Sequence, residues 1–249
     1  MLNVGVLAFS VTVCSVAQAQ LQRPLTIPVK PSSSQQSAVQ PLLARAEIRR
    51  DPRLGTITFL KAPNLSEPLE HDTGFAQLQA NRQFGDLARA FIHAYRTDFR
   101  LAHPASELRV HSVKTDSLGL THVRLQQTFH DVPVWAVELV VHLNAATQVY
   151  LVQGRYIPTP HNLSTDPELT KQTALQRAAD HLGRPLTECL TCQAVLVIFA
   201  AEGKAPRLTY RVLASLSVAE GWEVMVNAQT GEVLQKLSTI QGRRQSEGR

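Results

Sequence analysis

The segment Thr121–Leu143 constrains the fold more than any other part of the sequence. It reads THVRLQQTFHDVPVWAVELVVHL, with apolar and polar residues alternating on both sides of His130–Asp131. Such alternation is typical of strands with one buried face, and a short polar turn between two of them predicts a hairpin. The first strand is predicted to turn Val123, Leu125 and Phe129 to the core. Its opposite face is predicted to be polar: His122, Arg124, Gln126 and Thr128. In the second strand, Val134–Leu143, the inward residues are predicted to be Trp135, Val137, Leu139, Val141 and Leu143.

A helix is predicted beside this hairpin, over residues 84–95. Its apolar residues recur at steps of three and four and form one stripe: Phe84, Leu87, Ala88, Phe91, Ile92 and Tyr95. A short helical turn at 41–50 and a polar loop before this helix are also expected. Further strands are predicted at 55–61, 108–114 and 148–156. Sequential strands joined by short turns, with a helix on one face, predict an α+β layer.

A second unit of the same kind is predicted after the proline-containing break at 158–166. It begins with a helix at Pro167–Leu182, which Gly183 and Pro185 terminate. Strands are then expected at 194–200, 207–216, 222–226 and 232–237. We therefore expect two modules, 45–157 and 158–240, each an antiparallel sheet packed against a helix.

The two ends of the sequence are predicted to lie outside these modules. Residues 1–19 have a short apolar run and the small-x-small pattern Ala17-Gln18-Ala19, which predict a cleaved signal peptide. Residues 20–44 are rich in Pro, Ser and Gln and are expected to form a flexible linker. Residues 241–249 are expected to be a disordered basic tail. The mature chain is thus expected to be exported, to a periplasm or outside the cell, and to have no membrane helix.

The overall charge does not indicate nucleic-acid binding. The net charge is +5 and the basic residues are scattered, with the densest group, Arg243, Arg244 and Arg249, in the tail. A nucleic-acid site would require clustered arginines with interleaved aromatic residues. We therefore expect no nucleic-acid partner.

Two cysteines remain after the predicted cleavage, Cys189 and Cys192. Their CxxC spacing precedes an apolar strand, whereas a redox CxxC usually opens a helix in a βαβ unit. No further cysteine pair is present to complete a four-ligand zinc site. The sequence leaves open a local disulfide or two free thiols.

The sequence offers no recognisable catalytic or metal-binding motif. No His is followed by Glu, so the HExxH motif of zinc peptidases is absent, as are GxSxG, GxxxxGK[ST] and GxGxxG. We therefore expect no catalytic residue, no metal ligand and no cofactor. The polar row His122, Arg124 and Gln126 fits either a binding site or the solvated face of a half-buried sheet.

The hairpin segment resembles the propeptide of thermolysin-like (M4) and fungalysin-like metallopeptidases, known as the FTP domain. Residues that match its pattern are Gly119, Thr121, His122, Arg124, Gln126, Gln127, Phe129, Pro133 and Val134. Asp131 and Ala136 stand where this pattern commonly has Gly, although Asp tolerates a left-handed turn. The phrase VNAQTGEVL and the strand RLTYRV resemble PepSY, the module that follows FTP in these proteins.

The resemblance implies a non-catalytic chain that looks like a propeptide without its enzyme. Such propeptides assist folding of the catalytic domain and block its cleft. We therefore expect an inhibitor or folding chaperone that acts in trans on an M4-type zinc metallopeptidase. The expected contact residues are His122, Arg124, Gln126, Trp135, Arg243 and Arg244, although Trp135 would also fit a core position. A truncated zymogen remnant and an exported binding or sensing module remain as alternatives.

Overall fold

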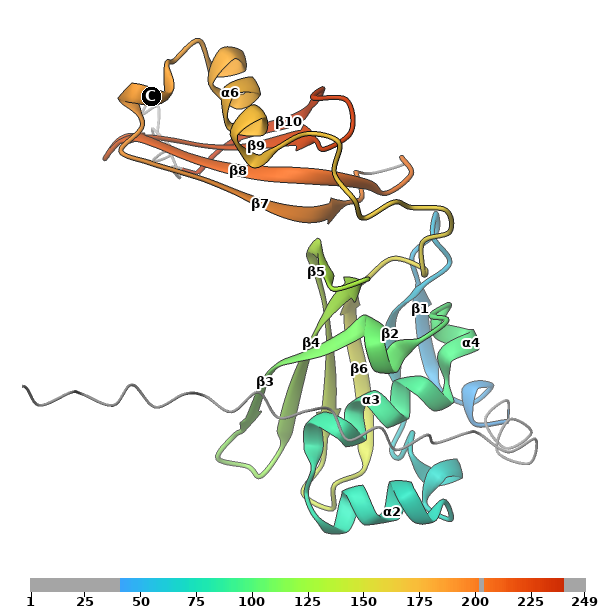
Figure 1. Cartoon of the computed structure of the whole chain (residues 1–249). Helices are drawn as coiled ribbons and strands as arrows, with labels where there is room; N and C mark the ends of the chain where they lie inside the picture. The colour runs from blue at the N-terminus through green and yellow to red at the C-terminus, as the bar shows by residue number, and fades with distance from the viewer. Residues whose placement is uncertain (1–40, 202–203, 240–249) are drawn as a thin grey trace, which may run out of the picture.

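Antiparallel sheets with helices on one face make up the protein, as the α+β prediction requires (Figure 1). The computed structural model describes residues 41–201 and 204–239. The predicted signal peptide, most of the predicted linker and the basic tail lie outside these residues.

The first sheet contains six strands in the order β1-β2-β6-β5-β4-β3. Their bounds are β1 Glu47–Arg50, β2 Ile57–Lys61, β3 Leu108–Thr115, β4 Thr121–Phe129, β5 Val132–Leu143 and β6 Val149–Arg155. All neighbouring pairs in this sheet are antiparallel.

Helices cover one face of this sheet (Figure 1). They are η1 Glu67–Leu69, α2 Thr73–Ala80, α3 Phe84–Ala94, α4 Arg96–Phe99 and α5 Pro104–Glu107. The predicted stripe of α3 is correct, since Leu87, Ala88, Phe91, Ile92 and the adjacent Tyr95 are fully buried. They pack against Val123 and Leu125 of β4 and Leu139, Val141 and Leu143 of β5 in one apolar cluster.

Five elements of the first sheet region were not predicted: β1, η1, α2, α4 and α5. The expected helical turn at 41–50 is present at residues 41–43, but β1 occupies the end of that segment. Helix α2 occupies part of the expected polar loop. The side chain of Asp72 caps α2 by accepting a hydrogen bond of 2.8 Å from the backbone N–H of Phe75. Only Phe75 and Leu78 of this helix are buried, so its apolar periodicity is too weak to be seen in the sequence.

The second sheet has four antiparallel strands in the order β7-β8-β9-β10. These are β7 Thr191–Phe199, β8 Arg207–Ser217, β9 Glu220–Asn227 and β10 Val233–Ser238, with the short turn η2 at Leu186–Glu188. Helix α6, Lys171–Leu182, covers one face of this sheet and buries Ala174 and Ala178 against it. The helix begins four residues later than predicted because Thr170 is its N-cap, accepting from the backbone N–H of Thr173 at 3.1 Å.

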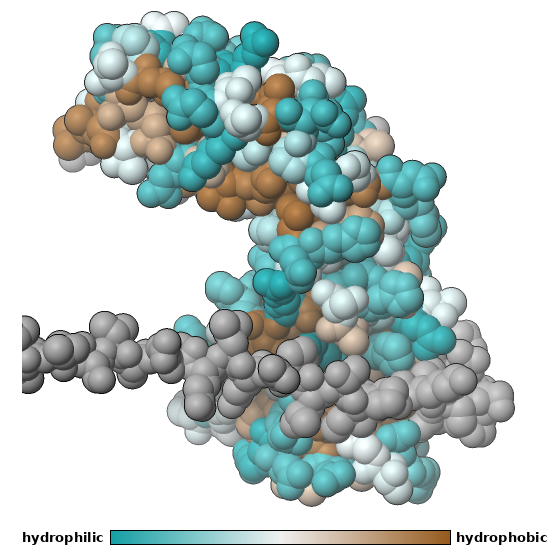
Figure 2. Space-filling view, viewed as in Figure 1, coloured by the Kyte–Doolittle hydropathy of each residue, from teal (hydrophilic) through white to brown (hydrophobic). Residues whose placement is uncertain are grey.

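The two sheets meet at the beginning of β5. Val134 of β5 pairs in parallel with Ile198 of β7, and both side chains are fully buried. Figure 2 shows a hollow between the two halves of the molecule, with apolar surface along the second half.

An irregularity in β5 makes this junction possible, and predictions around it are corrected. The register between β4 and β5 shifts between Gln126 and Thr128, and Ala136 has a left-handed backbone with φ 57°. Consequently Phe129, Trp135 and Val137, all predicted to face the core, do not join the cluster under α3 but pack in two small clusters at the junction. Thr128, predicted on the exposed polar face, is buried at 2% exposure, and its hydroxyl donates to the backbone carbonyl of Ser106 at 3.2 Å.

Candidate functional site

The face of the first sheet opposite its described helices carries the predicted polar row. On β4, Thr121, Val123 and Leu125 are buried, while His122, Arg124 and Gln126 project to the opposite face. Their partners on β5 are His142, Val140 and Glu138, respectively. The sequence prediction therefore named one half of a two-stranded polar surface.

His122 and His142 form the centre of this surface. Their Nδ1 atoms lie 2.7 Å apart, and their rings meet edge to face with centroids 4.8 Å apart. Nε2 of His122 lies 3.3 Å from Oδ2 of Asp116, and Nε2 of His142 lies 3.3 Å from Nε2 of Gln153. The four side chains form a continuous polar chain from the β3–β4 turn to β6.

The turn that precedes β4 holds Asp116 in place. Its Oδ1 accepts hydrogen bonds of 2.9 Å from the backbone N–H groups of Leu118 and Leu120. The Leu120 bond, with smaller contributions from His122 and Leu118, holds the pKa of Asp116 below its usual value. This carboxylate is therefore ionised and fixed beside His122.

Burial keeps His142 neutral over most of the pH range. It lowers the pKa of His142 to about 4, and the charges of His122 and Arg124 add to this effect.

Arg124 and Gln126 are also engaged within the sheet. Arg124 forms an ion pair with Glu138, although about half of the Arg124 side chain is exposed. The Gln126 amide donates to the backbone carbonyls of Gln127 at 3.1 Å and Val134 at 2.8 Å. Both side chains are thus held in defined positions on a surface that solvent reaches.

Trp135 lies apart from this surface. Cζ of Arg211 on β8 is 3.7 Å from the centre of the Trp135 ring, a cation–π contact. Nη2 of Arg211 also lies 2.6 Å from Oε2 of Glu223 on β9. The ring packs near Val197, Phe199 and Met225, so the structure places Trp135 at the junction between the sheets.

Of the remaining predicted site residues, Arg243 and Arg244 lie outside the described residues.

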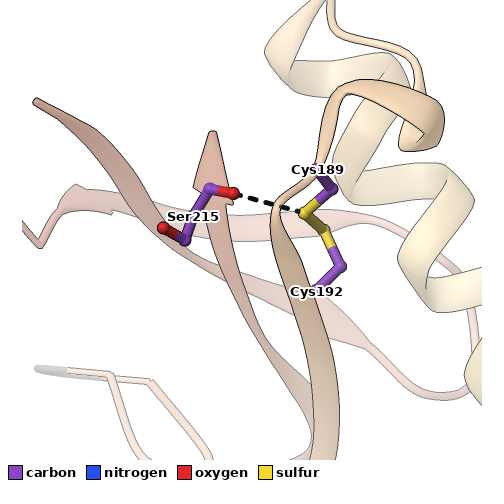
Figure 3. Close-up of a disulfide and its surroundings, with 3 residues drawn as sticks. All are labelled: Cys189, Cys192 and Ser215. Atoms are coloured by element: carbon purple, nitrogen blue, oxygen red, sulfur yellow. Dashed lines mark hydrogen bonds between the residues drawn. A yellow bond between two sulfur atoms is a disulfide. The ribbon is translucent and has the colours of Figure 1, made fainter. Parts of the chain in front are cut away.

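Cys189 and Cys192 are joined by a disulfide at the start of β7 (Figure 3). Sγ of Cys189 lies 3.7 Å from the carbonyl oxygen of Ser215, which also accepts the backbone N–H of Leu190 at 2.9 Å. The disulfide thus fixes the chain beside β8 before β7 begins.

Sequence reasoning did not connect His142, Glu138 and Asp116 with the predicted row. A hairpin paired evenly outward from Phe129 and Val132 would place Leu139 opposite His122. The irregularity in β5 moves the pairing by three residues, so His142 takes that position. The only sequence signal was Ala136, which stands where the resembled pattern has Gly and adopts the left-handed backbone that Gly favours.

Among residues 41–201 and 204–239, no group of three or more His, Cys, Asp or Glu side chains is placed to hold a metal ion. No helix in the same ranges is both long and apolar enough to cross a membrane.

Comparison with known proteins identifies the region that contains this surface. Residues 106–156 match the Fungalysin/Thermolysin Propeptide Motif, a range that contains β3 to β6. The chain is 26% identical over 164 residues to a thermolysin from Alicyclobacillus acidocaldarius subsp. acidocaldarius, covering 62% of this chain and 30% of the relative. It is 28% identical over 177 residues to the thermostable neutral protease NprT from Geobacillus stearothermophilus, covering 66% of this chain and 31% of the relative.

A bacillolysin from Bacillus subtilis (strain 168) is similarly related, at 28% identity over 152 residues, covering 55% of this chain and 28% of the relative. The chain therefore spans less than a third of the length of these relatives. Among solved structures, the C-terminal domain of Bacillus megaterium YpeB overlaps with a TM-score of 0.31 and 12% identity, covering 63% of this chain and 64% of that one. Residues 106–156 thus carry the fungalysin/thermolysin propeptide motif, in a chain that resembles the propeptide part of thermolysin-like metallopeptidases.

Proposed function

We propose that this chain is a non-catalytic, propeptide-like protein that binds the catalytic domain of a thermolysin-like (M4) zinc metallopeptidase in trans. Bound there, it acts as an inhibitor, as a folding chaperone, or as both. The observation that carries the proposal is the propeptide motif over residues 106–156, together with the matching part of three metallopeptidases. A partner that binds only the native catalytic domain stabilises it by mass action, and the same contact can exclude substrate.

The contact surface in this proposal is the polar face around His122, Arg124 and Gln126. Three properties support it. The face lies within the matched motif, the described helices of this region lie on the opposite face, and its side chains are held by neighbours rather than free to rotate. Side chains that are already ordered lose less conformational entropy when a partner binds. Arg243 and Arg244 are proposed to contribute a second, basic contact.

Two measurements on one mixture test the function. The purified chain is added to a thermolysin-like catalytic domain, and peptide hydrolysis is followed as a function of chain concentration. The same catalytic domain is separately unfolded and refolded with and without the chain, and the recovered activity is measured. Saturable inhibition or a higher refolding yield supports the proposal, whereas no effect in either assay refutes it.

Charge reversal tests the contact surface. Arg124→Glu is expected to weaken inhibition at least about tenfold, because it reverses the charge at the proposed contact. Because this change also disturbs the ion pair with Glu138, the double variant Arg124→Glu, Glu138→Arg restores the pair and separates folding from binding. Arg207→Glu is the matched control, since Arg207 is similarly exposed (44% against 49%) and also ion-paired, but on β8.

The tail is tested by deleting residues 241–249. Inhibition that is unchanged by this deletion and by Arg124→Glu would show that the partner binds elsewhere.

We also propose that residues 45–157 and 158–240 are two domains, the second being PepSY-like. The two largest apolar clusters support this division, since their buried members run from Leu43 to Tyr156 and from Ala174 to Ala228. Limited proteolysis with a protease of broad specificity should then cut first between residues 158 and 170. First cuts inside either sheet would contradict the division.

Export of the chain is part of the same proposal, to a periplasm or outside the cell. The signal-peptide pattern of residues 1–19 supports it, as does the disulfide between Cys189 and Cys192, because disulfides persist in oxidising compartments.

A further inference from the structure

We propose that His122 and His142 form a two-imidazole binding site for a divalent transition-metal ion of the Zn²⁺ and Cu²⁺ class. The inference rests on the polar face of the first sheet alone and does not depend on the proposed partner. The two residues are directly opposite each other on β4 and β5. Their Nδ1 atoms converge to 2.7 Å, so one ion between the strands would contact both rings.

The distance between the two nitrogens is close to what a shared ion needs. Zinc binds imidazole nitrogen at about 2.0–2.1 Å, so two nitrogens in a tetrahedral site are about 3.3 Å apart. The rings would have to separate by roughly 0.6 Å. Small side-chain rotations achieve this, because both histidines are only partly buried.

The outer nitrogen of each ring has a partner that orients it. A metal-bound histidine usually donates its second N–H to a carboxylate, carbonyl or water, which fixes the tautomer that ligates. Asp116 Oδ2 lies 3.3 Å from Nε2 of His122 and is held by two backbone bonds. When Asp116 accepts Nε2–H, the lone pair of His122 is on Nδ1, facing His142.

Gln153 gives His142 the same arrangement. Its amide nitrogen lies 3.3 Å from Nε2 of His142, and a flip of the amide group brings the oxygen into that place as an acceptor. Both Nδ1 lone pairs then point into the same space. In the absence of metal that space holds the Nδ1–H of one neutral ring, which donates to Nδ1 of the other. When His142 is this donor, its proton moves to Nε2 as Nδ1 binds the ion.

The charged side chains around the two histidines offset one another, so they do not exclude a cation. They also do not favour hard cations such as Mg²⁺ or Ca²⁺. Lys114 of β3 stands opposite His122 and Arg124 follows on the same strand, while Asp116 and Glu138 offset them. Imidazole ligands favour Zn²⁺ and Cu²⁺ over Mg²⁺ and Ca²⁺, which prefer oxygen. Two protein ligands leave the other coordination positions to water or to a side chain of a bound protein.

The test is a titration of the purified, metal-free chain with Zn²⁺, followed by calorimetry and by NMR of the histidine side chains. One ion per chain is expected, with the largest shifts on His122 and His142, and Mg²⁺ at the same concentration should produce neither effect. His142→Asn is expected to weaken binding at least tenfold. Asp116→Asn, a positioning change, is expected to weaken it about 10- to 100-fold.

His111→Asn is the matched control, because His111 is an exposed histidine on β3 of the same sheet. It should leave Zn²⁺ affinity unchanged. Far-UV circular dichroism and the thermal midpoint of each metal-free variant establish that the variant is folded. His122→Asn removes the other proposed ligand and should weaken Zn²⁺ binding in the same way. Equal affinity in the His142→Asn and His111→Asn variants, or the absence of Zn²⁺-induced NMR shifts on both His122 and His142, would overturn the inference.

Discussion

Replacing Trp135 tests whether this side chain joins the two sheets. The indole ring comes from β5 of the first sheet and stacks on Arg211 of β8, whose guanidinium also pairs with the buried carboxylate of Glu223. Trp135→Ala removes the ring and leaves the Arg211–Glu223 pair more exposed to water. The variant should therefore unfold more easily, even though Trp135 is far from the cluster under α3.

The size of the effect follows from two contributions. A largely covered Trp ring buries about 150 Å² or more, which at about 25 cal/mol per Å² contributes about 3–4 kcal/mol as an upper bound. The stacked guanidinium adds about 1–2 kcal/mol in a partly desolvated position. Because the site can partly relax, we expect a loss of about 3–4 kcal/mol, within the range of Trp→Ala changes in cores.

Urea unfolding followed by far-UV circular dichroism measures this loss, and a double-mutant cycle isolates the stacking contact. Trp135→Ala and Arg211→Met are made singly and together, and their coupling should be about 1–2 kcal/mol. Trp222→Ala serves as the control partner for Arg211. Trp222 packs with the cluster under α6, on the other face of the second sheet, so its coupling to Arg211 should be near zero.

A loss below about 1 kcal/mol in Trp135→Ala, with no coupling to Arg211, would refute the junction role. If that variant also bound the metallopeptidase domain more weakly, Trp135 would belong to the partner surface, in line with the resemblance to the propeptides.

Three further changes have defined outcomes. Ala136→Gly should stabilise the chain by about 0.5–1 kcal/mol in urea unfolding, because Ala136 has φ 57° and Gly adopts this backbone without strain. Reducing the Cys189–Cys192 disulfide, which closes a loop with a sequence separation of 3, should cost about 2 kcal/mol in the same assay. A hydrogen bond from the backbone N–H of Leu54 is the main cause that lowers the pKa of Asp51 from 3.8. The stabilisation of the fold by the ionised Asp51 carboxylate is therefore complete above pH 3.8 and is lost as the pH falls through the lower folded-state pKa. An NMR titration of the Asp51 carboxyl group measures this pKa. Acid unfolding of Asp51→Asn, compared with the unchanged chain, measures the loss of stability.

The spacing of apolar residues was sufficient to predict an element wherever one face of that element is buried by a single layer. The α3 stripe and the alternation of β4 up to Gln126 are examples, because each side chain there is either under the helices or in solvent. The left-handed turn at Asp131 was also foreseen, and its φ of 67° agrees. Strand β1 and helix α2 were missed because their burial comes from distant parts of the chain rather than from their own periodicity.

The candidate site was predictable only in part, because one strand serves two sheets. Val134 turns from β4 to pair with Ile198 of β7, while Pro133 before it and Glu138 after it both pair with β4. The left-handed Ala136 lies in the segment between them. This insertion sets the pairing for the rest of the hairpin and brings His142, not Leu139, opposite His122. Where regular pairing resumes, β6 approaches so closely that a Cβ on Gly154 would lie 2.1 Å from the carbonyl oxygen of Glu138. The histidine pair therefore depends on the junction between the sheets, a long-range feature that alternation within either strand does not contain.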